Sequence, residues 1–165
     1  MKKYELTAEF IEQWGKKLFR IKALISFGSV EAGELGGYVE KEDNLAQDGD
    51  AWVCDDAWVC GDAEVYGDAR VCGNARVCGN ADCLLIGRIG SRFSFTTFFK
   101  NKDKGITVSC GCFLGTIAEF RAKVTDTHGN NKHAKMYNLA ADMAELQILG
   151  EEYFDKLNTN KSEPF

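Results

Sequence analysis

The sequence predicts a mainly β fold: a short parallel coil of strands, about three turns long, with a different structure closing each end. Two observations predict it. From Gly49 to Leu84 the chain repeats every six residues, as GDAWVC, DDAWVC, GDAEVY, GDARVC, GNARVC and GNADCL. All eleven phenylalanines lie outside this repeat, at or before Phe27 and at or after Phe93. The flanking segments therefore need a second hydrophobic core of their own.

Each six-residue block has the geometry of one short strand and one corner. Ala and Val stand two residues apart, so both side chains point to the same side of the strand. Gly-Asp or Gly-Asn then turns the chain. Three such strands close a triangle, and triangles stacked about 4.8 Å apart satisfy one another's backbone hydrogen bonds. Residues three blocks apart, such as Trp52 and Arg70, are therefore expected to stack.

These blocks resemble the hexapeptide repeats of trimeric acyltransferases. In that family an aliphatic residue is followed four positions later by a small one, as in Val53/Ala57 and Val71/Ala75 here. The resemblance covers about residues 35–90 and implies a left-handed parallel β-helix and a homotrimer. The order of LGGYVEKEDNLAQDGDAWV, the repeats, FTTFF and VSCGCF also resembles small repeat proteins encoded by bacterial phages and prophages.

The chain divides into three segments on this basis. Residues 1–34 form an N-terminal helix and strand cap, residues 35–90 the hexapeptide-repeat β-helix, and residues 91–165 a C-terminal β-hairpin with a two-helix cap. A helix is expected from Thr7 to Trp14, and alternating apolar residues predict a strand over 18–25. The segments FSFTTFF and ITVSCGCF flank NKDKG and predict the hairpin.

Two helices are expected after the hairpin. Thr116 and Glu119 have the spacing of a capping box, which predicts a helix through about Val124. Asn131 is expected to cap a second helix that ends near Gly150. One stripe of this second helix, made of Met136, Leu139, Ala140, Met143 and Leu146, is predicted to face the core, with a binding groove as the alternative.

Composition excludes several kinds of partner. The net charge of −5 disfavours binding to nucleic acid. No segment approaches the roughly 20 apolar residues of a membrane helix, and the N-terminus has no secretory signal. A cytosolic location in a bacterial host is expected, and the seven cysteines would be thiols there. Stacked pairs such as Cys54 and Cys72 are expected to lie within the Cα range of a disulfide, so their redox state stays open. Cys110-Gly-Cys112 lacks C-x2-C spacing and a histidine close in sequence, so no metal site and no cofactor is predicted.

The sequence does not point to an enzyme. Acyltransferases of the family that the repeats resemble place a histidine base on the coil, but His128 and His133 both lie beyond the repeat. No nucleophile elbow, phosphate loop or metalloprotease motif is present. His128 and His133 are therefore weak catalytic candidates, and loop or helix-cap positions are favoured for both. A diverged acyltransferase is the second functional hypothesis.

The outer faces of the repeat combine indole and guanidinium groups. These groups are enriched at protein interfaces, and they also suit an aromatic anion, because a base stacks on indole while guanidinium binds phosphate. Packing in a homotrimer and a ligand cleft between subunits both stay open, as does a purely structural or protein-interaction module. The favoured function is a non-enzymatic, phage-type protein that sequesters a small anionic ligand, a cyclic or linear nucleotide used as an immune signal. The candidate ligand-binding residues are Trp52, Trp58, Arg70, Arg76, Arg88 and Arg92.

Overall fold

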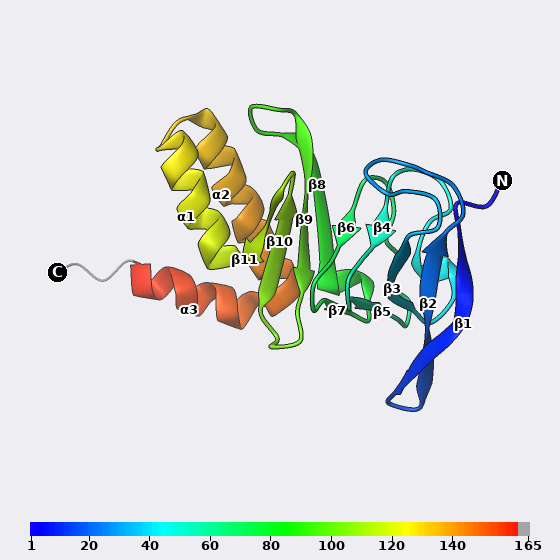
Figure 1. Ribbon diagram of the computed structural model, residues 1–165. Coiled ribbons are helices and arrows are strands. Elements are labelled where there is room, and N and C mark those ends of the chain that lie inside the picture. The colour runs from blue at the N-terminus through cyan, green and yellow to red at the C-terminus, as the bar shows by residue number, and fades with distance from the viewer. Residues whose placement is uncertain (162–165) are drawn as a thin grey trace.

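Three layers make up the molecule, from the N-terminal strands through a central sheet to the C-terminal helices (Figure 1). The computed structural model describes residues 1–161. None of the helices in this range is long and apolar enough to span a bilayer. The strands are β1 Tyr4–Gln13, β2 Lys16–Ala23, β3 Leu35–Val39, β4 Trp52–Val53, β5 Trp58–Val59, β6 Arg70–Val71, β7 Arg76–Val77, β8 Cys83–Ile89, β9 Ser94–Lys100, β10 Ile106–Cys110 and β11 Phe113–Thr116. The helices are α1 Ile117–His128, α2 Lys132–Ala144, a π-helical turn Glu145–Leu149 and α3 Glu151–Lys161, with 3-10 turns at Glu42–Asn44 and Asn80–Asp82.

The expected left-handed parallel β-helix is wrong. The protein is a mixed α/β structure with three small sheets: a mixed sheet in the order β1-β2-β3-β5-β7, an antiparallel sheet in the order β11-β10-β9-β8, and the parallel pair β4-β6. Each of β4 to β7 has only two residues. Along the third side of the expected coil, the described residues form a single isolated bridge, between Leu45 and Val65. No continuous sheet therefore closes around the repeat, and the resemblance to hexapeptide-repeat acyltransferases does not give the fold.

The stacking of residues three blocks apart is nevertheless confirmed. β4 runs parallel to β6 with Trp52 opposite Arg70, and β5 runs parallel to β7 with Trp58 opposite Arg76. The small and aliphatic residues of the blocks point inward, as their spacing predicts. Those that are at most 2% exposed are Ala51, Val53, Ala57, Val59, Ala63, Val65, Ala69, Val71, Ala75 and Val77.

The N-terminal segment is a hairpin, so the helix expected over residues 7–14 is wrong. β1 pairs antiparallel with β2, from Tyr4 opposite Ala23 to Gln13 opposite Lys16. Trp14 and Gly15 connect them with φ values of 50° and 75°, which is the backbone of a tight two-residue turn between twisted strands. Pairing with a distant segment outweighs the local capping signal at Thr7. The strand expected over 18–25 is confirmed as β2.

The antiparallel sheet β8–β11 separates two hydrophobic cores. On one face, Phe99 is fully buried against the Ala and Val core of the repeat. On the other face, Phe98 packs with Phe120 of α1, and Phe120 packs with Tyr137 of α2, each pair with ring centroids 5.7 Å apart. The antiparallel pairing of β9 with β10 confirms the expected hairpin. The phenylalanine-rich flank thus supplies the second core that the sequence predicts.

Both predicted helix starts are confirmed. The Thr116 hydroxyl accepts a hydrogen bond from the Glu119 N–H, and the Glu119 carboxylate accepts one from the Thr116 N–H. At the start of α2, the Asn131 side chain accepts from the Ala134 N–H. Gly150 ends the π-helical turn with φ 91°, where the sequence places the end of the second helix. Helix α3, which follows, is a further element that the sequence analysis does not predict.

The predicted core-facing stripe of α2 is mostly wrong. Leu139, Met143 and Leu146 are 63%, 57% and 45% exposed, and Ala140 alone of the stripe is buried. The buried side of the helix instead consists of four alanines and one tyrosine. Its buried members are Ala134, Tyr137, Ala140, Ala141 and Ala144.

Two disulfides join stacked blocks that lie three apart in the sequence, so the expectation of thiols is wrong for four cysteines. Cys54 is bonded to Cys72 and Cys60 to Cys78, with Cα atoms 4.6 and 4.5 Å apart. The parallel register that stacks these positions brings their Cα atoms within the range that disulfides require. The remaining cysteines, Cys83, Cys110 and Cys112, are free thiols.

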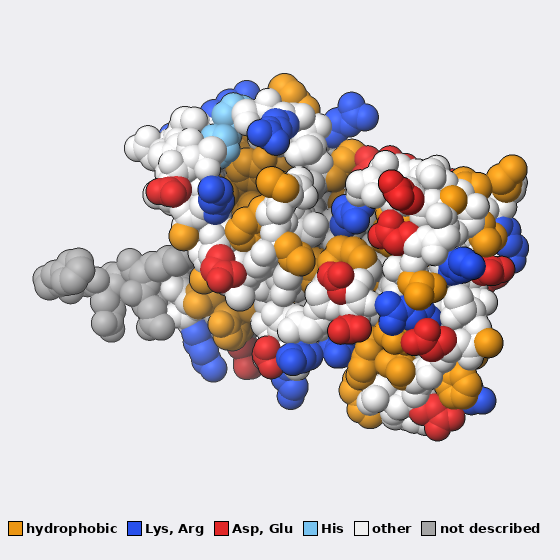
Figure 2. Space-filling model, viewed as in Figure 1, with side chains coloured by type: hydrophobic (Ala, Val, Ile, Leu, Met, Phe, Trp, Pro, Cys, Tyr) orange, Lys and Arg blue, Asp and Glu red, His pale blue; other side chains and the backbone are white. Residues whose placement is uncertain are grey.

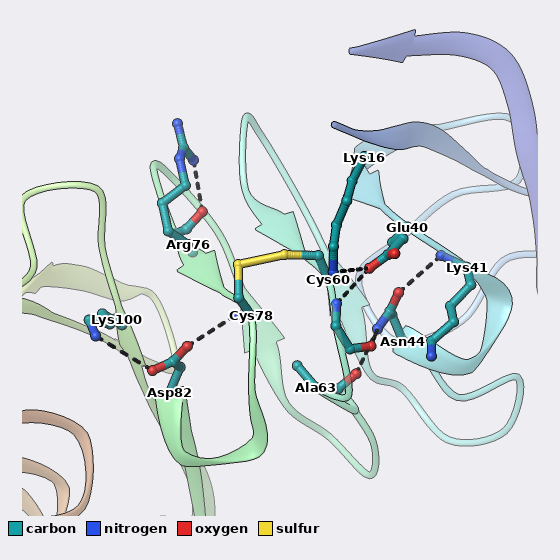
Figure 3. Close-up of a disulfide and its surroundings, with 12 residues drawn as sticks. Lys16, Glu40, Lys41, Asn44, Cys60, Ala63, Arg76, Cys78, Asp82 and Lys100 are labelled. Carbon is teal, nitrogen blue, oxygen red and sulfur yellow. Dashed lines mark hydrogen bonds and ion pairs between the residues drawn. A yellow bond between two sulfur atoms is a disulfide. The ribbon is translucent and has the colours of Figure 1, made fainter. Parts of the chain in front are cut away.

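Polar contacts fix the corners next to the second disulfide (Figure 3). The Glu40 carboxylate accepts hydrogen bonds from the Gly61 N–H at 2.7 Å and from Lys16 Nζ at 3.3 Å. The bond from Gly61 is the main reason that the pKa of Glu40 lies below its ordinary value. The fully buried Asn44 donates to the carbonyl of Ala63 at 2.9 Å. A side-chain amide thus replaces strand pairing on the side of the repeat where strands are missing.

The free thiol of Cys83 should make stability fall at alkaline pH. Burial, with a smaller contribution from Asp82, raises the pKa of Cys83 from 9.0 to about 12. Between these values the unfolded chain has lost the thiol proton and the folded chain has kept it. We therefore expect the free energy of unfolding to fall from pH 9 to pH 12, by about 1 kcal/mol per pH unit from this group. Urea unfolding at several pH values measures this effect. The free energy of unfolding of Cys83→Ala should fall less steeply with pH than that of wild type, and an equal fall would contradict the assignment to Cys83.

Candidate functional site

A cavity of about 240 Å³ opens between the central sheet and helices α1 and α2. We call it the sheet–helix cavity. Aromatic side chains from Phe113, Phe120 and Tyr137 form its apolar walls. Its polar lining includes Arg92, Lys123 and His128 and contains no carboxylate. In Figure 2 the histidine side chains, in pale blue, lie among hydrophobic and Lys or Arg side chains at the end of the molecule formed by α1 and α2.

The turn between β8 and β9 brings Arg92 to the rim of this cavity. Gly90 in the same turn has φ 80°, and a side chain there would collide with the ring of Tyr137. The glycine therefore lets the turn lie directly on α2. Burial raises the pKa of Tyr137, the neighbouring Cys110 thiol raises it further, and Arg92 opposes both effects. Tyr137 therefore lies between Arg92 and the Cys110 thiol, with its side chain in contact with that thiol.

The two histidines lie at the junction of α1 and α2. His128 is the last residue of α1 and stacks on Tyr137, with centroids 5.8 Å apart and planes at 27°. His133 lies in the first turn of α2, 5.6 Å from His128 between centroids. Its buried Nδ1 has no hydrogen-bond partner among the described residues. Only His128 lines the cavity, so the two weak catalytic candidates are neighbours with different surroundings.

Two free cysteines line the same cavity at the tip of the β10–β11 hairpin. Cys110 ends β10 opposite Phe113 of β11, which leaves Gly111 and Cys112 as a two-residue loop. Gly111 has φ 58°, a left-handed conformation that such tight turns use. Cys110 is half-buried and its sulfur accepts a hydrogen bond from the Thr96 hydroxyl at 3.3 Å, whereas Cys112 is exposed.

The structure does not bring the six candidate ligand-binding residues together. Trp52 is 0% exposed, and it is packed edge-on against Tyr4 and Phe27 with centroids 6.4 and 5.3 Å away. This leaves no Trp52 surface for a ligand. The Arg76 guanidinium lies 3.6 Å from the ring centroid of Trp58, so each of these two groups already has the stacking partner that a ligand would need to supply.

Arg70 and Arg88 lie at a second, more open cavity beside the repeat. Asp50 and Asp68 line it as well, and their carboxylates offset the two positive charges. Arg70 also donates to the Ser29 hydroxyl at 2.8 Å. Of the six candidate ligand-binding residues, only Arg92 lines the sheet–helix cavity. The weak catalytic candidate His128 lines the same cavity.

One cluster of possible metal ligands occurs within residues 1–161, formed by Cys54, Asp55 and Cys72. Both of its sulfurs belong to a disulfide. Bonded sulfurs cannot act as thiolate ligands, so the donor set does not fit a structural or catalytic zinc ion. The chain offers no support for a metal at this position.

Sequence reasoning missed Lys123 and Tyr137 and did not connect Cys110 with His128. Lys123 and Tyr137 stand in ordinary amphipathic helices, where nothing in the sequence marks them. The cysteine pair did have a signal, because Cys-Gly-Cys at the centre of a predicted hairpin places two thiols at a turn. Neither protein-family models nor curated proteins match this chain, so the residues that line the cavity are what indicates its chemistry.

Proposed function

We propose that this protein binds small organic anions in the sheet–helix cavity and that it holds a nucleotide there without converting it. The observation that supports this proposal is the charge of the lining. Arg92 and Lys123 are cations at neutral pH, His128 adds a further donor, and no carboxylate lines the cavity. Guanidinium and ammonium groups bind phosphate and carboxylate through charge-assisted hydrogen bonds.

The size and walls of the cavity limit the ligand. A volume of about 240 Å³ falls just below the roughly 300–1,000 Å³ of pockets for drug-sized molecules. The ligand should therefore be no larger than a mononucleotide. Its anionic group would lie at the rim, where Arg92 and Lys123 are exposed, and its apolar or aromatic part would lie against Phe113 and Phe120.

The proposed ligand belongs to the class that the sequence favours, a small anion. The proposed site is the sheet–helix cavity and not the outer faces of the repeat. A single nucleotide remains a member of the class, and sequestration of such a signal remains the proposed use. A cytosolic setting, which the sequence predicts, would present Cys110 and Cys112 at the cavity as thiols. The acidic linings elsewhere suit an anion less well. A cavity of about 610 Å³ beside the repeat has one cation, Lys41, among five carboxylates, those of Glu42, Asp43, Asp48, Asp62 and Glu64.

Calorimetric titration with defined anions tests the proposal. The probes are AMP and cyclic AMP, with uncharged adenosine as the comparison. We expect at least one anion to bind and the double substitution Arg92→Glu/Lys123→Glu to weaken its binding more than tenfold, because two charge-assisted contacts become repulsive. Chemical analysis of the recovered probe should show that it is unchanged.

The matched control is Arg88→Glu/Lys102→Glu. It changes the net charge by the same amount, and both residues are exposed and lie outside the sheet–helix cavity. Its affinity should equal that of wild type within a factor of about two. Equal losses in the two double variants would mean that overall charge, not this cavity, attracts the anion. Turnover of a bound nucleotide would overturn the claim that the nucleotide is held unconverted.

A further inference from the structure

The cysteine pair Cys110 and Cys112 lines the sheet–helix cavity beside its cations, and its placement suggests chemistry of its own. The hairpin is closed by the two-residue loop Gly111-Cys112. Consecutive Cα atoms are about 3.8 Å apart, and the chain bends at this turn, so the Cα atoms of Cys110 and Cys112 are roughly 5–6 Å apart. Disulfides need Cα atoms 4.4–6.8 Å apart. Both residues line the same cavity, so their side chains reach a common space.

The two thiols differ in exposure in the way that a dithiol reaction requires. Cys112 is exposed at the loop, where a molecule in solution can reach its sulfur. Cys110 is half-buried at the end of β10, held by the Thr96 hydroxyl and next to Tyr137. An exposed sulfur can attack first, and a sheltered sulfur beside it can complete the exchange. The third free thiol, Cys83, lines a different cavity, on the far side of the sheet.

We propose that Cys110 and Cys112 form a redox-active pair that reduces a small anionic disulfide bound in the sheet–helix cavity. This inference rests on the proposed function for its ligand class, because Arg92 and Lys123 would hold the carboxylates of that disulfide. Glutathione disulfide, whose charged groups are carboxylates and ammonium groups around an apolar disulfide, is the model compound. One half of it would occupy the cavity while the other half stays in solvent.

The reaction balances in two exchange steps. The Cys112 thiolate attacks one sulfur of the bound disulfide, so a bond from Cys112 to that sulfur forms, the ligand's own S–S bond breaks, and the released thiolate takes up a proton. The Cys110 thiolate then attacks the Cys112 sulfur, which forms the Cys110–Cys112 disulfide and releases the second ligand thiol. Two electrons pass from the cysteine pair to the ligand, and the two cysteine protons end on the two released thiols.

The sequence offers a clean way to follow this reaction. Cleavage after lysine and arginine gives the peptide 105–121, which contains Cys110 and Cys112 and no other cysteine. The full-length protein is treated with oxidised glutathione or with the uncharged hydroxyethyl disulfide, and free thiols are then alkylated. Mass spectrometry of this peptide distinguishes two free thiols, one mixed disulfide and the internal disulfide.

We expect wild type to form the internal disulfide, about tenfold faster with oxidised glutathione than with the uncharged disulfide, because the cationic lining concentrates the anion. Cys110→Ser should stop at a mixed disulfide on Cys112. Cys112→Ser should leave Cys110 largely unmodified. Cys83→Ser, which removes a free thiol outside the cavity, should react as wild type does.

Two results would overturn the proposal. A mixed disulfide on Cys112 that persists in wild type would show that Cys110 does not complete the exchange; anion binding by Cys112→Ser, measured calorimetrically, would then show that the proposed function stands without it. Equal rates with both disulfides, unchanged in Arg92→Glu/Lys123→Glu, would overturn the claim that the disulfide is bound by the cationic lining. Titration with AMP then decides separately whether the proposed function stands.

Discussion

We expect Trp52→Ala to lower the free energy of unfolding by about 3–5 kcal/mol, the range for removing a large aromatic side chain from a packed core. Trp52 is 0% exposed and lies between the repeat and the N-terminal hairpin, in contact with Tyr4 and Phe27. A side chain on Gly36 would collide with Trp52, so the strand that crosses the indole leaves space for it. Truncation would leave a void that this rigid wall cannot fill. Urea unfolding followed by circular dichroism measures the loss.

Trp58→Ala is the matched control for this substitution. Trp58 occupies the same position in the next block, with the same sequence Ala-Trp-Val-Cys. It is only half-buried, between Arg76 and the exposed Trp14. Its removal should cost about 1–2 kcal/mol, since it forfeits partial burial and one cation–π contact. Equal losses for the two variants would contradict the view that the N-terminal hairpin makes Trp52 a core residue.

Much of the packing could be predicted from the sequence because it depends on local spacing. The two-residue separation of Ala and Val in each block puts both on the inner side, and the stacking of Trp52 with Arg70 follows from three identical steps. Thr116 and Glu119 form the capping box that their spacing predicts. In each of these cases the interaction is determined by residues close together in the chain, or by an exact repeat of them.

The fold class could not be obtained in the same way. A six-residue period indicates that corners recur, but it does not show whether all three sides become strands. On the third side, where strand pairing was expected, the Asn44 side-chain amide donates to the Ala63 carbonyl. Leu45 and Val65 form only an isolated bridge there. The helix expected from Thr7 fails for a related reason, because β2 offers β1 a partner along its length. Tertiary pairing decides both cases.

The candidate site was beyond sequence reasoning because four separate segments build it. Arg92 comes from the turn after β8, Cys112 from the hairpin loop, Lys123 from α1 and Tyr137 from α2. The period of the repeat draws attention to its Trp and Arg residues instead. Two of these, Trp58 and Arg76, satisfy each other, which no spacing rule reveals.

Reduction of the two disulfides should have the other large effect on stability. Each bridge spans a sequence separation of 18, and closing a loop of that length stabilises a folded chain by about 3 kcal/mol through the entropy of the unfolded state. The loops 54–72 and 60–78 overlap, so the second bridge should add less than the first. We expect urea unfolding with a phosphine reductant to show a total loss of about 4–5 kcal/mol.

Paired variants separate this effect from the cavity thiols. Cys72→Ala/Cys78→Ala should reproduce the loss without reductant, whereas Cys110→Ser/Cys112→Ser should unfold as wild type does and respond fully to reductant. An unchanged unfolding midpoint on reduction would mean that the Ala and Val residues keep the repeat compact in the unfolded state. A bridge then removes little further conformational entropy from the unfolded chain and adds little stability. The same measurement bears on location: a loss of this size would leave the repeat markedly weaker in a reducing cytosol, where the bridges would be open.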